Sequence, residues 1–253
     1  MIDLYTNILP NVDKGPRDTT AFLAMAKCLV DQGVTSVVAA PGYDNQDTEQ
    51  LTIQMHVDAA NERLQHSFIP LTILPGQKTI IHDRLVTAFE QNTLITVNRC
   101  TKYVLLQIPN EYTFSSTEQI LYQLQLKGVV PIISEPERQS VFLENPDQLY
   151  ELVKKGAIVQ LSAGSLIGKN GRKEKKAAFS FLNHGLAHVI ASGVSADTYE
   201  SYTLPKAYEI VSKQLGTQAL YKFMGNADYV AEGKAIFKEQ PERVKKGKIL
   251  GIF

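Results

Sequence analysis

The side chains best suited to chemistry in this sequence are charged ones at the ends of short apolar runs. They are Asp3, Asp13, Lys14, Lys78, Glu135, Glu137 and Arg138. Asp and Glu carboxylates are ligands for hard metal ions, whereas Lys and Arg side chains bind phosphate and other anions. Such a set predicts a charged functional site, provided that the fold brings these positions together.

The histidines give no comparable signal, because all five fall in expected helices or at the start of expected strands. His184 and His188 have the i, i+4 spacing of a helical metal pair. However, Gly185 and the strand expected from Ala187 interrupt the helix that this pair would need. We therefore expect no metal site at these histidines.

Two motifs further along the chain carry weak signals. The segment Gly164–Asn170 resembles a phosphate loop, but it is one residue short between its glycines and has no Ser or Thr after Lys169. It remains a candidate glycine-rich turn that lets the backbone approach an anion. The basic run Lys169–Lys176 is expected to be the solvated start of a helix.

The charged positions must be held by the apolar runs, which are near-continuous, as is typical of parallel strands covered on both faces. The seven expected strands are residues 1–5, 36–40, 69–74, 103–108, 129–133, 157–161 and 187–191. Helical signals lie between them, such as Asp18 as an N-cap and Pro146 and Pro205 in first turns. The pattern predicts one α/β domain over residues 1–253, either an open doubly wound sheet or a closed barrel. In both, the functional surface lies at the C-terminal ends of the strands.

Composition narrows the possible partners. Lys+Arg and Asp+Glu both number 26, and no basic block is large enough for a nucleic-acid surface. The apolar runs are far shorter than the roughly 20 residues that a membrane helix needs, so we expect no direct membrane insertion. The N-terminus has no basic segment followed by an apolar one, which favours a cytoplasmic location. The oligomeric state is left open.

Several segments in order along the chain resemble the PHP (polymerase and histidinol phosphatase) family, in its branch of bacterial capsule and exopolysaccharide protein-tyrosine phosphatases. These segments are Met1–Pro16, Gln32–Pro41, Pro75–Gln77, Gly128–Arg138, Gln160–Gly168, His188–Ser192 and Gly225–Gly233. The resemblance implies a (β/α)7 PHP barrel, similar to a distorted TIM barrel, with manganese at its strand ends. It also implies hydrolysis of phosphotyrosine, usually on the tail of a partner tyrosine kinase of polysaccharide export.

The sequence departs from the family pattern at the positions that the resemblance matches to metal ligands. All eight differ: Tyr5, Asn7, Lys14, Gly42, Lys78, Glu135, Gly193 and Ser195. The ammonium groups of Lys14 and Lys78 would repel a metal ion. We therefore expect a divergent member, a catalytically inactive pseudophosphatase with a regulatory or binding role and no cofactor. Arg138 is retained as a candidate phosphate contact.

Other interpretations remain open for these residues. Lys14, Lys78 and Arg138 could form a metal-free anion pocket, or Lys14 or Lys78 could simply pair with Glu135 or Asp13. An active phosphatase could hold manganese on a rebuilt carboxylate site of Asp3, Asp13, Glu135 and Glu137. A third class, a Schiff-base enzyme, would use Lys14 or Lys78 as its nucleophile.

Overall fold

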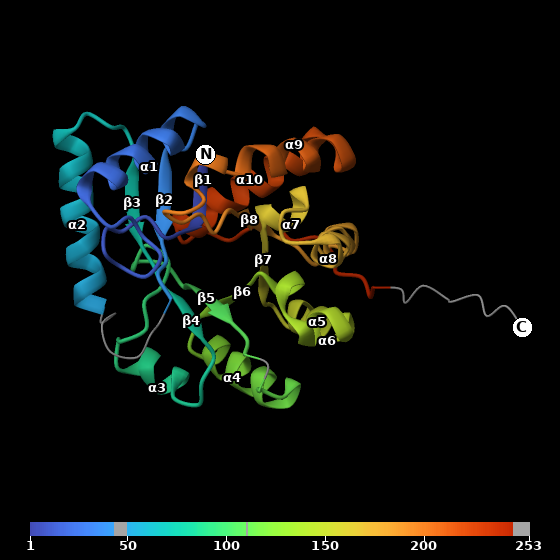
Figure 1. The fold of residues 1–253 in the computed structure, drawn as a ribbon. Helices are drawn as coiled ribbons and strands as arrows, with labels where there is room; N and C mark the ends of the chain where they lie inside the picture. The colour runs from blue at the N-terminus through green and yellow to red at the C-terminus, as the bar shows by residue number, and fades with distance from the viewer. Residues whose placement is uncertain (43–49, 110, 245–253) are drawn as a thin grey trace, which may run out of the picture.

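Short parallel strands form the centre of the molecule, and helices surround them (Figure 1). The structure is a computed structural model and describes residues 1–42, 50–109 and 111–244. Its strands are β1 (Ile2–Thr6), β2 (Ser36–Ala39), β3 (Thr72–Pro75), β4 (Lys78–Ile80), β5 (Tyr103–Gln107), β6 (Val130–Ser134), β7 (Ile158–Ser162) and β8 (Val189–Ala191). Each of the seven expected strands is present, with its ends moved by up to three residues.

The strands form two parallel sheets that join into a barrel. One sheet has the order β1-β2-β3, and the other has the order β4-β5-β6-β7-β8. Parallel bridges connect the two sheets in two places, from Gly42 after β2 to Lys78 on β4 and from Thr6 on β1 to Val194 after β8. This closure decides between the two architectures and, with β3 and β4 counted as one bent strand, confirms the (β/α)7 barrel.

The bend between β3 and β4 depends on Gly76. A Cβ atom at this position would lie 2.5 Å from Cγ1 of Val38 on the neighbouring strand β2, a contact that no side chain tolerates. The close approach lets β3 pair with β2 while β4 turns to pair with β5. Lys78, the first residue of β4, is thereby placed at the C-terminal end of the barrel.

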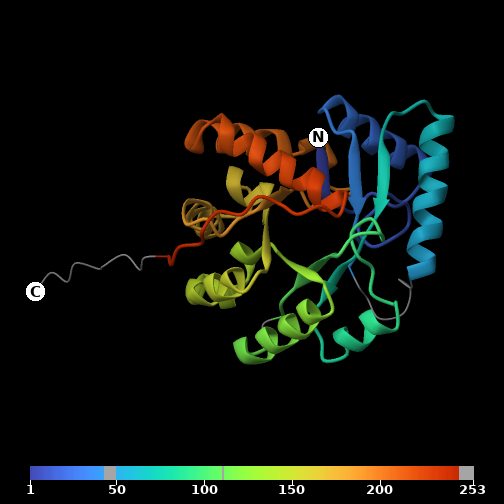
Figure 2. The same cartoon turned by 180° about the vertical axis from the view of Figure 1, so that it is seen from behind.

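Helices cover the outside of the barrel (Figures 1 and 2). They are α1 (Thr19–Asp31), α2 (Gln50–His66), α3 (Leu85–Glu90), α4 (Phe114–Leu126), α5 (Ser140–Glu144), α6 (Pro146–Lys154), α7 (Ala163–Ile167), α8 (Arg172–Asn183), α9 (Leu204–Leu215) and α10 (Thr217–Ala231), with 3-10 turns η1 (Pro136–Arg138) and η2 (Tyr199–Ser201). The Asp18 side chain accepts from the Ala21 N–H at 2.8 Å, and Pro146 and Pro205 lie in first turns, as expected. Among the described residues, no helix is both long and apolar enough to cross a membrane.

The apolar core fills the barrel and the space between strands and helices. Leu4, Val38, Leu105 and Ile132 are among the buried side chains of one cluster with members on both sheets. At the N-terminal ends of the strands, the segment after α10 crosses the barrel (Figure 2). There the Tyr103 hydroxyl donates to the Lys234 carbonyl at 2.5 Å. The C-terminal ends of the strands carry the polar residues.

Candidate functional site

A cavity of about 500 Å³ opens at the C-terminal ends of the strands, where the sequence predicts the functional surface. Seven of the eight expected positions line it: Tyr5, Asn7, Lys14, Lys78, Glu135, Gly193 and Ser195. Arg138 lines it as well. Gly42 does not, and its N–H donates to Oδ2 of Asp13 at 2.9 Å. The fold therefore brings together seven of the eight positions that depart from the family pattern, with Arg138 beside them.

Four of these residues form a charged cluster, the Glu135 cluster, consisting of Tyr5, Lys78, Glu135 and Arg138. Lys78 Nζ lies 3.5 Å from Glu135 Oε2 and 4.4 Å from the centre of the Tyr5 ring. Arg138 Nη1 lies 2.9 Å from Glu135 Oε1. The side chains of Glu135 and Lys78 are 10% and 15% exposed, whereas that of Arg138 is 49% exposed. Of the arrangements considered for Lys78, the structure contains the ion pair with Glu135.

The surroundings keep the Glu135 cluster charged. Burial alone would raise the pKa of the Glu135 carboxyl, but Lys78 and Arg138 outweigh it and hold that pKa below its ordinary value. Burial likewise opposes the charge on Lys78, yet Glu135 and then Tyr5 raise the pKa of its ammonium group. The cluster has two cations for one carboxylate, so one positive charge is in excess.

The backbone of two segments is shaped to hold this cluster. Glu135 follows β6 in the left-handed conformation, with φ of 51°, which a non-glycine residue rarely adopts. Its N–H donates to the Gln160 carbonyl on β7 at 2.8 Å. Gly193, with φ of 63°, passes close to Tyr5, because a Cβ atom there would lie 3.3 Å from Tyr5 Cε1. The absence of a side chain at position 193 thus leaves room for the Tyr5 ring.

Asp3 lies below the cavity and closes the barrel between β1 and the end of β8. Its carboxylate is fully buried and accepts from Ser192 N–H at 3.0 Å, Ser192 Oγ at 2.5 Å, the Tyr202 hydroxyl at 2.8 Å and the Tyr5 N–H at 3.3 Å. Burial raises the pKa of Asp3 although these hydrogen bonds oppose the rise. The sequence marked Asp3 as a candidate ligand but gave no sign of this structural role.

Glu137 is also buried, behind Glu135 on η1. Its Oε1 accepts from the Ser162 N–H at 2.9 Å, which ties η1 to the end of β7. Burial, and then the charge of Glu135, raise the pKa of Glu137 to about 7. Like Asp3, it does not line the cavity.

The residues present do not fit a manganese ion. Within the described ranges, no three His, Cys, Asp or Glu side chains come together in a way that could hold a metal. The four carboxylates of a rebuilt site already have other partners: Asp3 at the barrel seam, Asp13 with the Gly42 N–H, Glu135 with two cations and Glu137 with the Ser162 N–H. An ammonium group within the site adds repulsion against a divalent cation.

Cations at the rim add positive charge to the cavity. Lys14 is exposed and lines the cavity, and its carbonyl accepts from the Ala196 N–H. Lys169, from the segment with the weak phosphate-loop signal, also lines it and donates to Ser201 Oγ at 2.6 Å. That segment forms α7 and a turn, in which Asn170 Nδ2 donates to Ser165 Oγ at 3.0 Å. In the sequence, Lys169 was marked by this motif and by the basic run Lys169–Lys176.

His188 lies at the other end of the barrel and is 1% exposed. Its Nδ1 accepts from the Val159 N–H at 3.1 Å, and burial lowers its pKa to about 3. It is a neutral core histidine that stabilises the start of β8.

Comparisons with known proteins cover essentially the whole chain. A family model described as "Capsular polysaccharide synthesis, CpsB/CapC" matches residues 1–232. Tyrosine-protein phosphatase YwqE of Bacillus subtilis is 33% identical over 100% of both chains, and putative tyrosine-protein phosphatase CapC of Staphylococcus aureus is 28% identical over 98% of both. A solved structure from work on YwqE and Streptococcus pneumoniae CpsB, described as metal-dependent tyrosine phosphatases, superposes with a TM-score of 0.92. It is 33% identical and covers 97% of this chain and 100% of its own.

Proposed function

The chain belongs to the CpsB/CapC family of capsular polysaccharide synthesis, and from this membership we propose that it is a pseudophosphatase that binds phosphotyrosine without hydrolysing it. The relatives named tyrosine-protein phosphatases indicate the chemical class of the ligand. The natural ligand would be a phosphotyrosine segment of a partner protein, such as the tail of a tyrosine kinase of polysaccharide export. The role is then regulatory, since binding shields the phosphotyrosine or competes for it.

The observation that carries the loss of catalysis is the position of the Lys78 ammonium group. It lies among the strand ends, paired with Glu135 and stacked on Tyr5. Metal-assisted phosphomonoester hydrolysis needs anionic or imidazole ligands around a cation that activates water. At an effective dielectric constant near 20, a divalent ion about 4–5 Å from an ammonium group would be disfavoured by several kcal/mol. The Glu135 cluster therefore replaces metal charge with side-chain charge.

The same charges support an anion-binding role. Arg138 uses one nitrogen for Glu135 and is half-exposed at the cavity, so other N–H groups of its guanidinium remain for a phosphoryl oxygen. Lys14 and Lys169 add positive charge at the rim. A phosphotyrosine monoester carries close to two negative charges at neutral pH. The cavity offers it cations and hydrogen-bond donors.

Two other functions fit the residues less well. A phosphatase with a rebuilt metal site would need carboxylates that are already engaged in other contacts. A Schiff-base enzyme that used Lys78 would need a neutral amine there, whereas the raised pKa of Lys78 keeps its amine protonated and unable to attack a carbonyl.

The proposal is tested by measuring binding and hydrolysis of one phosphotyrosine peptide on the same preparation. We expect saturable binding by fluorescence anisotropy and no manganese-dependent phosphate release. Lys14→Ala and Arg138→Ala should each weaken binding by about fivefold or more, as expected for lost charge-assisted contacts. Lys213→Ala, on the exposed surface of α9, is the control and should bind as the wild type does. Phosphate release that requires manganese would refute the pseudophosphatase, and unchanged binding in both site variants would refute the binding role.

A further inference from the structure

A row of exposed cations extends from the cavity along the start of α8. We call it the α8 basic edge and define it as Lys169, Arg172, Lys173 and Lys176, all of which are exposed. Within the described part of the chain, none of the four has an acidic side chain within 4.0 Å. The edge is thus a local cluster of positive charges without acidic partners, on a protein whose net charge is zero.

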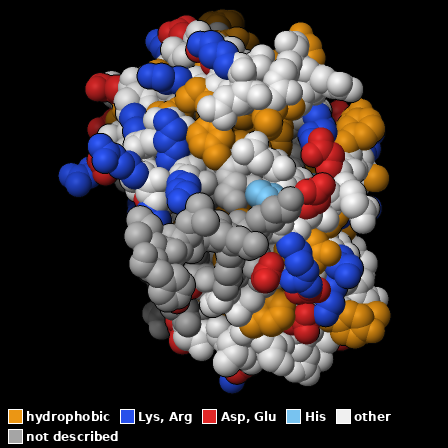
Figure 3. All heavy atoms as spheres, turned by 90° about the vertical axis from the view of Figure 1, so that its right-hand side faces the viewer, with side chains coloured by type: hydrophobic (Ala, Val, Ile, Leu, Met, Phe, Trp, Pro, Cys, Tyr) orange, Lys and Arg blue, Asp and Glu red, His pale blue; other side chains and the backbone are white. Residues whose placement is uncertain are grey.

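The edge is continuous with the cavity. Lys169 lines the cavity, and α8 packs against both α7 and η1, the turn that carries Arg138. Helix α8 lies on the right-hand side of Figure 1, the face that Figure 3 turns toward the viewer. On the left part of Figure 3, Lys and Arg side chains gather with few acidic ones among them. The cavity and the edge therefore meet at Lys169, which belongs to both.

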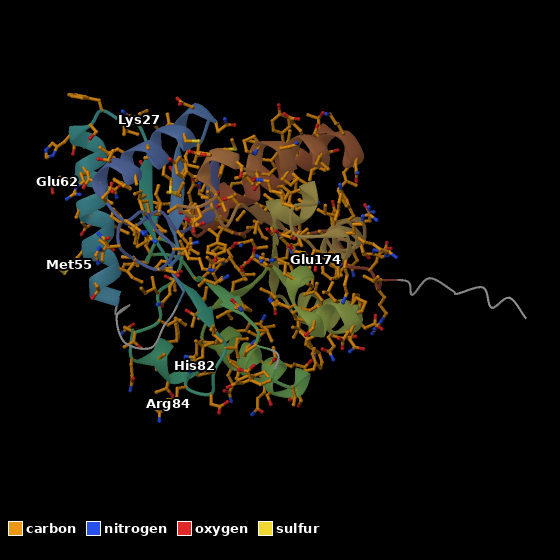
Figure 4. All side chains as sticks on the ribbon, viewed as in Figure 1. Lys27, Met55, Glu62, His82, Arg84 and Glu174 are labelled. Atoms are coloured by element: carbon orange, nitrogen blue, oxygen red, sulfur yellow. The ribbon has the colours of Figure 1, made fainter. Side chains whose placement is uncertain are left out.

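The placement of these cations works against the local helix. The N-terminus of a helix carries the positive end of its dipole, so basic residues in the first turn are unfavourable there. The N-cap Gly171 has no side chain to offset this, and Glu174 is the one acidic residue of the first turn. Glu174 (Figure 4) folds its carboxylate back toward Gly171. Residues that break a local rule without a structural gain mark functional surfaces in many proteins.

We propose that the α8 basic edge binds acidic residues that flank the phosphotyrosine of a partner polypeptide, an inference that rests on the proposed function of the cavity. From Arg172 to Lys176 the helix rises about 6 Å, the span of roughly two extended peptide residues. Acidic residues close in sequence to the phosphotyrosine would then face the edge. A polypeptide fits better than an anionic polysaccharide, because one side chain enters the cavity while its neighbours run along the surface.

The test compares three fluorescent peptides by anisotropy: a phosphotyrosine peptide with acidic flanks, one with neutral flanks, and the acidic-flanked peptide with unphosphorylated Tyr. At low salt we expect the wild type to prefer acidic over neutral flanks by about 10-fold, with the preference falling as salt rises. The triple variant Arg172→Ala/Lys173→Ala/Lys176→Ala should reduce it to about threefold or less. Lys173→Glu alone is measured beside it, so that a folding defect in the triple variant leaves the test intact.

A matched control removes three cations elsewhere, through Lys27→Ala/Lys127→Ala/Lys213→Ala. These exposed residues lie near the C-terminal ends of α1, α4 and α9, and none of them lines the cavity. The control should keep the full preference, although its net charge equals that of the triple variant.

The outcomes separate this inference from the proposed function. Equal affinity for both phosphopeptides, or an unchanged preference in the triple variant, overturns the basic edge while leaving phosphotyrosine binding in place. Binding of the unphosphorylated acidic peptide alone, lost in the triple variant, supports the edge and refutes phosphotyrosine recognition. Polygalacturonate, an anionic polysaccharide, is added as a competitor. If it binds the wild type but not the triple variant, and displaces no peptide, the edge binds polysaccharide and the choice of a polypeptide partner is overturned.

Discussion

Glu135 shows how the site is held together at the scale of single residues. Its backbone adopts the left-handed conformation at the end of β6, and its carboxylate lies between the cations of Lys78 and Arg138. Both the backbone conformation and the burial of charge cost free energy. The two ion pairs and the Tyr5 ring over Lys78 offset these costs. Removing Lys78 or Arg138 should therefore destabilise the protein, because the buried charge of Glu135 is then less well compensated.

Lys78→Met is expected to lower the free energy of unfolding by about 2 kcal/mol or more, because Glu135 loses a partner while it stays nearly buried. Adding Glu135→Gln should recover part of that loss in a double-mutant cycle. The measurement is urea unfolding at pH 7.5. The control is Lys155→Met, which breaks an exposed pair with Glu118 and should cost less than about 1 kcal/mol. Equal costs for the two variants would contradict this account.

Glu137 should make stability depend on pH. Its pKa is raised to about 7 in the folded protein, so the folded state holds a proton that the unfolded state releases near pH 4.5. The favourable contribution is complete below pH 4.5 and is lost as the pH rises through about 7, a change of about 3 kcal/mol. Glu137→Gln keeps an oxygen to accept from the Ser162 N–H and removes the titration.

The measurement is the free energy of unfolding of wild type and Glu137→Gln at pH 5 and pH 8.5. We expect the variant to gain on the wild type at the higher pH. Glu209→Gln, at an exposed position on α9, should follow the wild type at both pH values. Identical pH dependence of wild type and Glu137→Gln would mean that the buried carboxyl is ionised at no cost.

At the scale of elements, Asp3 joins strands that are far apart in sequence. It binds Ser192 after β8 and Tyr202 before α9, and so fixes the seam at which the barrel closes. Asp3→Ala should lower stability by about 2–4 kcal/mol, because buried donors lose their acceptor. Asp3→Asn, which keeps one acceptor oxygen, should cost less. Thermal unfolding measures the stability of both variants. The control is Asp31→Ala, at the exposed end of α1. A cost under about 1 kcal/mol for Asp3→Ala would argue against the role of Asp3 in closing the barrel.

The strands and most helices could be predicted because their signals are local, as in the apolar run of β6 or the Asp18 cap of α1. The need for glycine at position 76 could not be predicted, because it comes from the close approach of Val38 on another strand. The same limit applies to the site. Strand-end positions predicted its place, but the roles of Asp3 and Glu137 depend on Ser192 and Ser162, which are remote in sequence.

At the scale of the whole molecule, the barrel and the chemistry of its site are separable. The chain superposes on a structure described with metal-dependent phosphatases at a TM-score of 0.92, although its own strand ends carry Tyr5, Lys78 and Gly193. Core packing and strand pairing specify the barrel, whereas a few residues at its mouth specify the reaction. The loss of metal chemistry proposed above would thus require no change in the barrel.

The most direct test of the central claim is the manganese content of the full chain. The protein is purified from cells supplied with manganese, beside Bacillus subtilis YwqE as a control, and both are analysed by inductively coupled plasma mass spectrometry. We predict less than about 0.1 equivalent of manganese or any other transition metal in this protein, and no change in its thermal midpoint with a chelator. About two or three equivalents, with a midpoint that falls on chelation, would contradict the account, because the cavity would then hold metal ions despite Lys78.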